Sequence, residues 1–148
     1  MYGETLREFA AAAQDDLGQL IAAASARLMK DAFERLSALG YPEVHPAHIA
    51  VFTGLDPEGT RVSVLAERAG ISRQAMSVLV RGLEQSGYLS TQADPSDQRA
   101  TLVRLDERGA AFCDAAIAIA RELDGEIARR LAPGRMQLLK ETLRSLGE

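Results

Sequence analysis

Residues 61–104 constrain the fold of this chain more than any other stretch, because serines and glycines divide them into two short helices and a hairpin. Ser63 is a candidate N-cap for a first helix that would end at Gly70, since glycine commonly closes a helix in the left-handed conformation. Ser72 is a candidate N-cap for a second helix that would end at Gly87. Two short helices joined by a brief link containing glycine are typical of a helix-turn-helix.

A β-hairpin is predicted directly after the second helix. YLSTQ (residues 88–92) and ATLVRL (residues 100–105) have strand character, clearest in the second run. The polar segment 93–99 between them has the turn chemistry of a loop. Helix, turn, helix and hairpin together predict a winged helix-turn-helix, a mainly α fold with a small β-hairpin wing.

The second predicted helix separates apolar from polar residues when about 100° is assigned to each residue. With Leu79 at the centre of the inner face, the residues nearest to it are Ala75, Met76, Gly82, Leu83 and Ser86. The opposite face carries Arg73, Gln74, Ser77, Arg81 and Glu84. Arginine can pair with guanine and glutamine with adenine, while serine can contact either. Ser72, Arg73, Gln74, Ser77 and Arg81 are therefore the candidate DNA-contacting residues, and a merely solvated polar face is the alternative.

Three segments give the chain a resemblance to a known family: LAERAGISRQAMSVLVRGLEQSGYL, the wing segment DPSDQR, and LVRLDERG after it. The chain resembles the MarR-type (multiple antibiotic resistance regulator) winged-helix regulators, closely in its central third and by length and pattern in its flanking helices. The resemblance implies a sequence-specific regulator that binds double-stranded DNA as a homodimer on a pseudo-palindromic operator. It also implies release by a small aromatic or lipophilic effector, with repression as the expected mode.

The predicted wing matches that family at two positions and departs from it at two others. Asp97 and Arg99 fit an Asp-x-Arg pattern, which implies that the aspartate holds the arginine while the arginine enters the minor groove. A narrow A·T-rich minor groove concentrates negative potential and so attracts an arginine. Gln98 and Thr91 stand where the family often has basic residues. In the alternative interpretation, Asp97 and Arg99 only fasten the hairpin.

The flanking segments are predicted to be helices of a single domain spanning residues 1–148, with the winged helix-turn-helix at 45–105. Residues 4–39 are rich in alanine, lack proline and repeat apolar residues at helical spacing, which predicts one long helix with a candidate interruption near Gly18. In the resembled family such a helix interlocks with the C-terminal helices across a two-fold axis. Burial of the helix within its own subunit is the alternative.

The C-terminal segment, 106–148, is predicted to complete the dimerisation region. Asp106 is a candidate N-cap for a helix that continues through Leu131, and Pro133 suits the first turn of a last helix. The last helix carries Met136, Leu139, Leu143 and Leu146 at helical spacing. This apolar face suits packing against the N-terminal helix of a second chain.

A short helix is predicted between the first long helix and the helix-turn-helix, with Ile49, Phe52 and Leu55 facing inward. Its two histidines, His45 and His48, are the only ones in the chain, whereas metal sites usually need three or four ligands. Capping and packing are therefore preferred to metal binding, and no metal is expected. The candidate effector-pocket residues are Tyr41, His45, His48 and Phe52, with core packing the preferred role for Phe52.

Charge and composition limit the function classes. The formal net charge is −4, but residues 61–108 carry seven arginines against six carboxylates, so this part is slightly basic and the rest is acidic. This distribution favours site-specific binding with few phosphate contacts over non-specific coating of DNA. The single cysteine, Cys113, excludes an intrachain disulfide, and a structural thiol is preferred to a redox sensor.

The sequence also argues against an enzyme and against a membrane protein. It has no glycine-rich phosphate loop and no nucleophile paired with a base, so neither catalysis nor a cofactor is expected. Its apolar runs are shorter than the ~20 residues that cross a bilayer, and a soluble cytoplasmic protein is expected. The alternative function is a winged-helix protein-interaction module without specific DNA binding, for which an apolar outward face on the second helix would be the marker.

Overall fold

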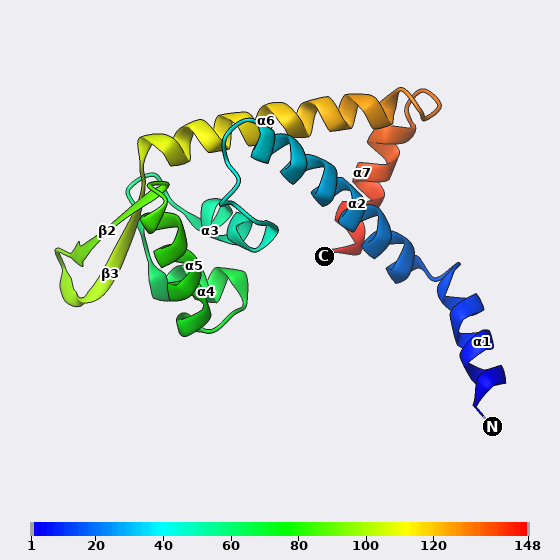
Figure 1. The fold of residues 1–148 in the computed structure, drawn as a ribbon, viewed down its shortest axis with the longest axis horizontal. Coiled ribbons are helices and arrows are strands. Elements are labelled where there is room, and N and C mark those ends of the chain that lie inside the picture. Colours follow the sequence, from blue (N-terminus) through cyan, green and yellow to red (C-terminus); the bar gives the residue numbers. More distant parts are fainter. Residues whose placement is uncertain (1, 148) are drawn as a thin grey trace.

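A computed structural model describes residues 2–147 of the chain and places a winged helix at one end of the molecule, below the start of the long helix α6 (Figure 1). In chain order the elements are α1 (Gly3–Ala13), α2 (Leu17–Ala38), the 3-10 helix η1 (Pro46–His48), α3 (Ile49–Gly54), β1 (Thr60–Arg61), α4 (Val62–Ala69), α5 (Arg73–Gln85), β2 (Leu89–Asp94), β3 (Asp97–Leu105), α6 (Glu107–Ala128) and α7 (Arg135–Leu146). The wing lies at one end of the molecule, and α1 projects from the other. The predicted fold class is confirmed.

The N-terminal segment is two helices, so the prediction of one long helix is wrong. The chain leaves α1 after Ala13, and Asp16 then caps α2 by accepting a hydrogen bond from the backbone N–H of Gln19 at 2.9 Å. An aspartate cap satisfies backbone groups at a helix start and therefore fixes where α2 begins. The break lies near Gly18, as expected, but the capping aspartate produces it.

The two helices of the helix-turn-helix end where the glycines predict. Of the two serines predicted as N-caps, only one is a cap. Gly70 closes α4 in the left-handed conformation with φ +65°. Ser72 caps α5, since its hydroxyl oxygen accepts a hydrogen bond from the N–H of Ala75 at 3.1 Å. Ser63 is not a cap, because α4 starts one residue before it, with Arg61 in the cap position.

The wing is a tight hairpin, and the loop predicted at residues 93–99 is mostly strand. β2 and β3 pair antiparallel, with a register shift between Ala93 and Asp94, and only Pro95 and Ser96 lie between the two strands. The two-residue strand β1 pairs antiparallel with the other edge of β3, giving the sheet order β1-β3-β2. β1 is too short to produce a periodic signal in the sequence.

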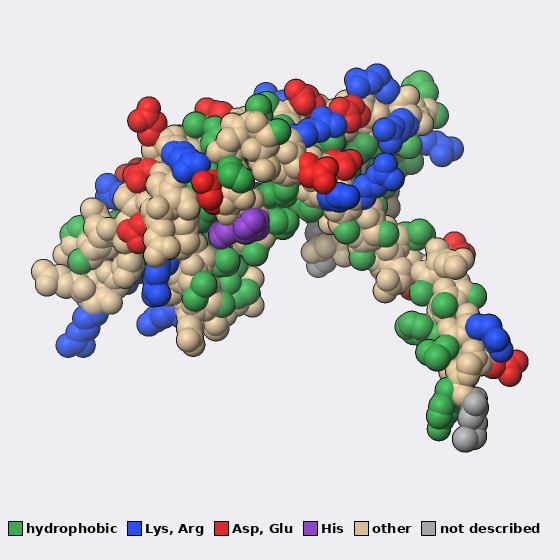
Figure 2. Space-filling model, viewed as in Figure 1, with side chains coloured by type: hydrophobic (Ala, Val, Ile, Leu, Met, Phe, Trp, Pro, Cys, Tyr) green, Lys and Arg blue, Asp and Glu red, His purple; other side chains and the backbone are tan. Residues whose placement is uncertain are grey.

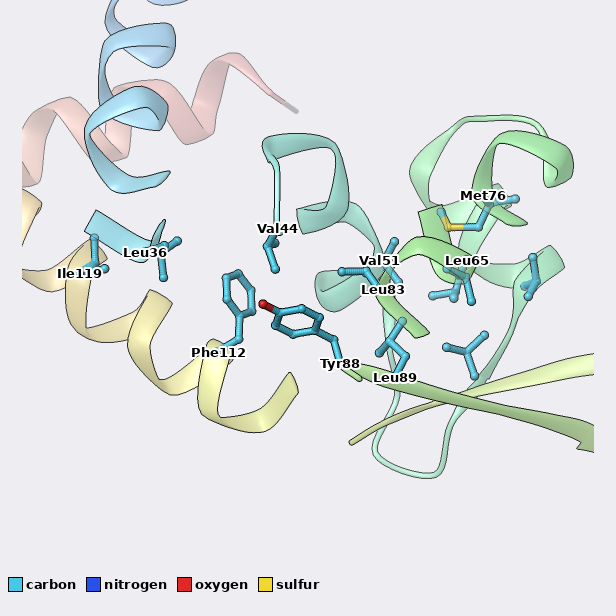
Figure 3. Close-up of a cluster of buried hydrophobic side chains, with 14 of the residues drawn as sticks. Leu36, Val44, Val51, Leu65, Met76, Leu83, Tyr88, Leu89, Phe112 and Ile119 are labelled. Carbon is cyan, nitrogen blue, oxygen red and sulfur yellow. The ribbon is translucent and has the colours of Figure 1, made fainter. Parts of the chain in front are cut away.

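Aromatic side chains join the winged helix to the long helices. Phe112 of α6 and Tyr88, just before β2, are almost fully buried and lie edge to face, with ring centroids 6.0 Å apart (Figure 3). Phe52 of α3 and Tyr41 complete the cluster, at 4.8 and 5.6 Å from the Phe112 ring. From this cluster the buried core continues under α4 and α5 through Val51, Leu65, Met76 and Leu83.

Arg108 fastens the same junction with polar contacts. Its guanidinium lies over the Tyr88 ring at 4.5 Å and donates hydrogen bonds to the backbone carbonyls of Ser86 and Gly40 and to the Glu43 carboxylate. Tyr88 in turn donates its hydroxyl hydrogen to Glu43 at 2.7 Å. One arginine therefore connects the end of α2, the end of α5 and the start of α6.

The last two helices differ from their predicted bounds. α6 ends at Ala128, three residues before Leu131, and α7 starts at Arg135, so Pro133 precedes α7 and is not in its first turn. Asp106 is at the N-cap position of α6, but its side chain makes no capping hydrogen bond. α6 runs very close to the wing at Gly109, where an added Cβ atom would lie 2.2 Å from the Tyr88 carbonyl oxygen.

The terminal helices leave large apolar side chains uncovered (Figure 2). In the described part of the chain, neither α1 nor α7 contains a buried residue, and Leu36 is the one buried residue of α2. The exposed apolar side chains include Leu6 and Phe9 of α1, Leu17, Leu20 and Ile21 of α2, and Leu138, Leu139, Leu143 and Leu146 of α7. The alternative in which the long N-terminal segment is buried within its own subunit is therefore wrong. Within residues 2–147, no helix has the length and apolar character needed to span a membrane.

Candidate nucleic-acid interface

The buried face of α5 is rotated from its predicted position. The three buried residues of this helix are Met76, Val80 and Leu83, whereas Leu79, the predicted centre, is only half-buried. Ala75 and Gly82, both predicted to face inward, are exposed. The true centre lies about 60° from the predicted one at 100° per residue.

Most of the predicted contact face remains open to solvent after this correction. Arg73, Gln74 and Arg81 are exposed, and no other segment of residues 2–147 covers them. Two candidate hydroxyls are engaged with the helix backbone instead. The Ser72 hydroxyl caps α5, and the half-buried Ser77 donates its hydroxyl hydrogen to the Arg73 carbonyl at 2.8 Å. Three of the five candidates therefore have side chains free to reach a partner.

Val78 belongs to the same face and was missed from the sequence. Its side chain is 62% exposed, and it lies about 200° around the helix from the buried Met76. A helical wheel with its inner face at Met76, Val80 and Leu83 would have placed Val78 on the outward face. The outermost line of α5 is therefore Gln74, Val78 and Arg81, a mixture of amide, apolar and guanidinium groups.

Glu84 was predicted to face outward, but it turns toward the wing. Its carboxylate accepts hydrogen bonds from the backbone N–H of Thr91, at 3.1 Å, and from the Thr91 hydroxyl. Thr91 lies in β2, so this contact joins the middle of the wing to the last turns of α5. The hydroxyl at position 91 therefore has a structural role.

Asp97 contacts Arg99 through the backbone. One Asp97 carboxylate oxygen accepts a hydrogen bond from the Arg99 amide at 3.1 Å, and both residues are exposed. Among residues 2–147 the Arg99 guanidinium has no carboxylate within ion-pair distance. Asp97 therefore shapes the backbone at the start of β3, and the Arg99 side chain stays exposed.

The ion pair that fixes the wing is between Arg61 and Asp94, a pairing that was not predicted from the sequence. The Arg61 Nε lies 2.6 Å from an Asp94 carboxylate oxygen, and its Nη2 donates to the Ser96 hydroxyl at 3.0 Å. The other Asp94 oxygen accepts from the Ser96 N–H at 2.8 Å and from its hydroxyl at 2.7 Å. Asp94 is only 8% exposed, and the Ser96 bonds, with a further contribution from Arg61, lower its pKa to about 2.

A polar cleft of about 280 Å³ separates the start of α5 from the wing. Its charged lining residues are Arg61, Arg73, Arg99 and Asp97. Three arginines from three different elements thus line one small space, together with one carboxylate residue, Asp97. The arrangement suits an anion, because guanidinium groups pair well with phosphate and carboxylate oxygens.

Comparison with known proteins agrees with this geometry. Residues 44–100, which contain η1, the helix-turn-helix and most of the wing, match the model of the MarR family. This central part of the chain is therefore similar to the MarR family. The HTH-type transcriptional repressor Rv2887 of Mycobacterium tuberculosis is 29% identical over 131 residues, covering 88% of this chain and 93% of that protein.

Solved MarR-family structures have the same fold. The repressor CouR bound to a 23-mer DNA duplex has a TM-score of 0.75 at 20% identity, covering 100% of this chain and 98% of that chain. A MarR-family transcriptional regulator from Rhodococcus sp. RHA1 has a TM-score of 0.71 at 21% identity, covering 90% and 93% of the two chains. At these identities the likeness establishes the winged-helix fold.

The four candidate effector residues do not form one pocket. Tyr41 and Phe52 are part of the aromatic cluster around Phe112, as core packing predicts for Phe52. His45 and His48 are stacked 5.6 Å apart, and the His45 backbone N–H donates to the His48 Nδ1 at 2.9 Å. The predicted capping role is therefore confirmed for the His48 side chain. Burial, followed by the charge of His45, lowers the pKa of His48.

An apolar cavity lies elsewhere, between α2, α3 and α6. Its volume is about 310 Å³, and its lining includes Leu28, Met29, Phe33, Leu36, Ile49, Ile119 and Leu123. A neighbouring open groove of about 680 Å³ includes His45, with Met29, Phe33, Val44 and Pro46. Only one of the four candidates therefore borders either space.

Metal and thiol chemistry have little support in this fold. Residues 2–147 contain no group of three or more histidine, cysteine, aspartate or glutamate side chains arranged to hold a metal ion. Cys113 is half-buried in α6, and burial, together with the nearby charge of Asp114, raises the pKa of its thiol. A raised pKa disfavours the reactive thiolate, in agreement with a structural role for Cys113.

Proposed function

We propose that this chain is a sequence-specific transcriptional repressor that places α5 in the major groove of double-stranded DNA. One observation carries the proposal: the exposed face of α5 presents Arg73, Gln74 and Arg81, and no other part of the described chain covers it. The major groove admits an α-helix, and each base pair displays a distinct pattern of donors and acceptors there.

The central line of that face matches the chemistry of base edges. Arg81 can donate two hydrogen bonds to guanine, and Gln74 can donate to and accept from adenine. Val78, between them on the same line, is suited to contact the methyl group of thymine. Arg99 on the wing then reaches the adjacent minor groove, with Asp97 shaping the backbone behind it.

The protein acts as a homodimer in this proposal, with residues 4–39 and 106–148 as the dimerisation region. Monomers rarely leave large contiguous apolar surface exposed, and the uncovered side chains of α1, α2 and α7 supply such a surface. A two-fold axis places the recognition helices on the same side, about 34–36 Å apart, to match half-sites one helical turn apart. The 23-mer duplex bound by CouR is long enough for two such half-sites.

A small aromatic or lipophilic effector regulates binding in this proposal. The apolar cavity between α2, α3 and α6 supports it, because it lies between the long helices and the winged helix and is near the lower end of usual ligand volumes. The related CouR was solved with p-coumaroyl-CoA. An effector shifts DNA binding only if it binds one arrangement of the two recognition helices better than another.

The proposal is tested by selecting duplexes from a random pool and titrating the selected site with variants of α5. Arg81→Ala or Arg73→Ala should cost about 1–3 kcal/mol per half-site if the side chain reads a base, and should relax preference at one position. Arg121→Ala, an exposed arginine in the middle of α6, removes the same charge away from this face. Wild-type affinity in both α5 variants, or a pool that yields no preferred site, would refute the assignment.

A protein-interaction module remains the second candidate, because one apolar residue stands at the centre of the exposed face. Val78→Ser separates the two functions. A base-reading helix loses discrimination at a thymine, whereas a protein-docking helix keeps any DNA affinity unchanged and loses its protein partner. The exposed guanidinium groups around Val78 favour the first outcome.

A further inference from the structure

The cleft between α5 and the wing lies beside the exposed face of α5 that is proposed to read bases. A helix in the major groove and a wing in the neighbouring minor groove are separated by one sugar–phosphate strand, since such a strand forms the wall between adjacent grooves. The space between helix and wing must therefore face that strand. In this chain, that space is the 280 Å³ cleft containing Arg61, Arg73 and Arg99.

Arg61 differs from the other two arginines because the protein already holds it in place. Its Nε and Nη2 are bound to Asp94 and Ser96, and a guanidinium has five N–H donors, so donors remain for a further partner. A side chain that is fixed before binding loses less conformational freedom when the partner arrives. Arg73 is the first residue of α5 and Arg99 is in β3, so they enter the same cleft from its two sides.

We propose that this cleft binds one backbone phosphate of the duplex, with Arg61 as its prearranged contact and Arg73 and Arg99 on either side. The inference rests on the proposed DNA-binding function. Asp94 and Asp97 offset two of the three positive charges nearby, so directed N–H donors contribute more to the site than net charge. The site positions the protein on DNA and carries no sequence information of its own.

The salt dependence of binding separates a phosphate contact from a purely structural role for Arg61. Arg61→Gln removes the charge, and it should weaken binding about tenfold per subunit on both the selected duplex and a scrambled one. The slope of log affinity against log salt should fall by about one per subunit. Arg104→Gln removes an exposed arginine from β3 outside the cleft, and it should leave the slope near the wild-type value.

Asp94→Asn controls for the fastening of the wing, because it breaks the same ion pair but keeps the Arg61 charge. The proposal expects the wild-type salt slope in this variant. Arg61→Lys keeps the positive charge but lacks the several N–H donors of a guanidinium group. This variant should keep the wild-type salt slope but bind DNA more weakly. A wild-type slope in Arg61→Gln, or an equal fall in Arg61→Gln and Asp94→Asn, would overturn the phosphate site. Failure of the wild-type protein to bind any duplex would instead refute the proposed function.

Discussion

Gly109→Ala and Gly125→Ala, two identical changes in α6, should shift stability in opposite directions. Alanine is favoured over glycine within a helix by about 1 kcal/mol, so either change gains helix stability if the new methyl group has room. At Gly125 it has room, because the nearest atom to the new Cβ is a terminal nitrogen of Arg129 at 3.6 Å. Gly125→Ala should therefore stabilise the protein by about 0.5–1 kcal/mol.

At Gly109 the methyl group would meet backbone. The Tyr88 carbonyl oxygen would lie 2.2 Å from the new Cβ, and the Leu105 Cδ1 would lie 2.7 Å from it. Relief requires a shift of more than about 1 Å between α6 and the wing, and overpacking of this kind typically costs about 1–3 kcal/mol or more. The shift would also stretch the hydrogen bond from the Asp106 N–H to the same carbonyl, now 3.1 Å, which contributes about 1 kcal/mol.

After the gain in helix stability is subtracted, Gly109→Ala should lose about 1–3 kcal/mol. For a domain of this size, each kcal/mol moves the thermal midpoint by roughly 2–4 °C. Thermal denaturation of the three proteins at one concentration measures both changes and avoids any concentration dependence from self-association. Equal midpoints for Gly109→Ala and Gly125→Ala would refute the close approach between α6 and Tyr88.

Four further outcomes follow from the structure. Ser72→Ala removes the α5 cap and should cost about 1 kcal/mol in urea denaturation, and an unchanged midpoint would contradict the cap. The Asp94 carboxylate, with a pKa of about 2, should stabilise the fold above about pH 4 and lose that effect as the pH falls through 2. The difference in thermal midpoint between wild type and Asp94→Asn should therefore narrow as the pH falls from about 4 to 2. A constant difference would contradict the lowered pKa of Asp94. Burial and the hydrogen bond to Glu43 raise the pKa of Tyr88 to about 12. The protonated phenol should therefore stabilise the fold below about pH 10 and lose that effect toward pH 12. The stability of Tyr88→Phe should fall less than that of the wild type over this pH range. Light scattering should give twice 15.9 kDa for the wild type and the single-chain mass for Leu143→Glu, whereas a wild-type monomer would contradict the dimer.

Local turn chemistry explains which parts of the fold could be predicted from the sequence. Gly70, Ser72 and Gly87 set their helix ends through contacts within a few residues, so the sequence around them is sufficient. The cap at Asp16 was also readable, because its partner, Gln19, is three residues away. Such short-range sequence signals were sufficient to predict the helix-turn-helix and the hairpin.

Contacts between distant segments explain what the sequence could not predict. Arg61 and Asp94 are 33 positions apart, and they meet only because β1 joins the sheet beside β3. The buried face of α5 depends in the same way on the surrounding core, which includes Leu65 and Val103, and residue spacing alone put its centre at the wrong residue. The exposure of Arg73, Gln74 and Arg81 could be predicted from residue spacing within α5, whereas the wing ion pair was missed because it is a tertiary contact.

The Arg108 junction determines how motion would pass through a symmetric pair of these chains. Arg108 ties the end of α5 to the end of α2 and the start of α6, so the end of α5 is held firmly against the long helices. α6 has 22 residues and is about 33 Å long, so a small rotation at one end displaces the other end appreciably. A tilt of about 5° at its far end displaces the other end by about 3 Å, close to the rise of one base pair. In the proposed dimer, small changes in how the long helices cross would thus produce larger displacements of α5 and the wing.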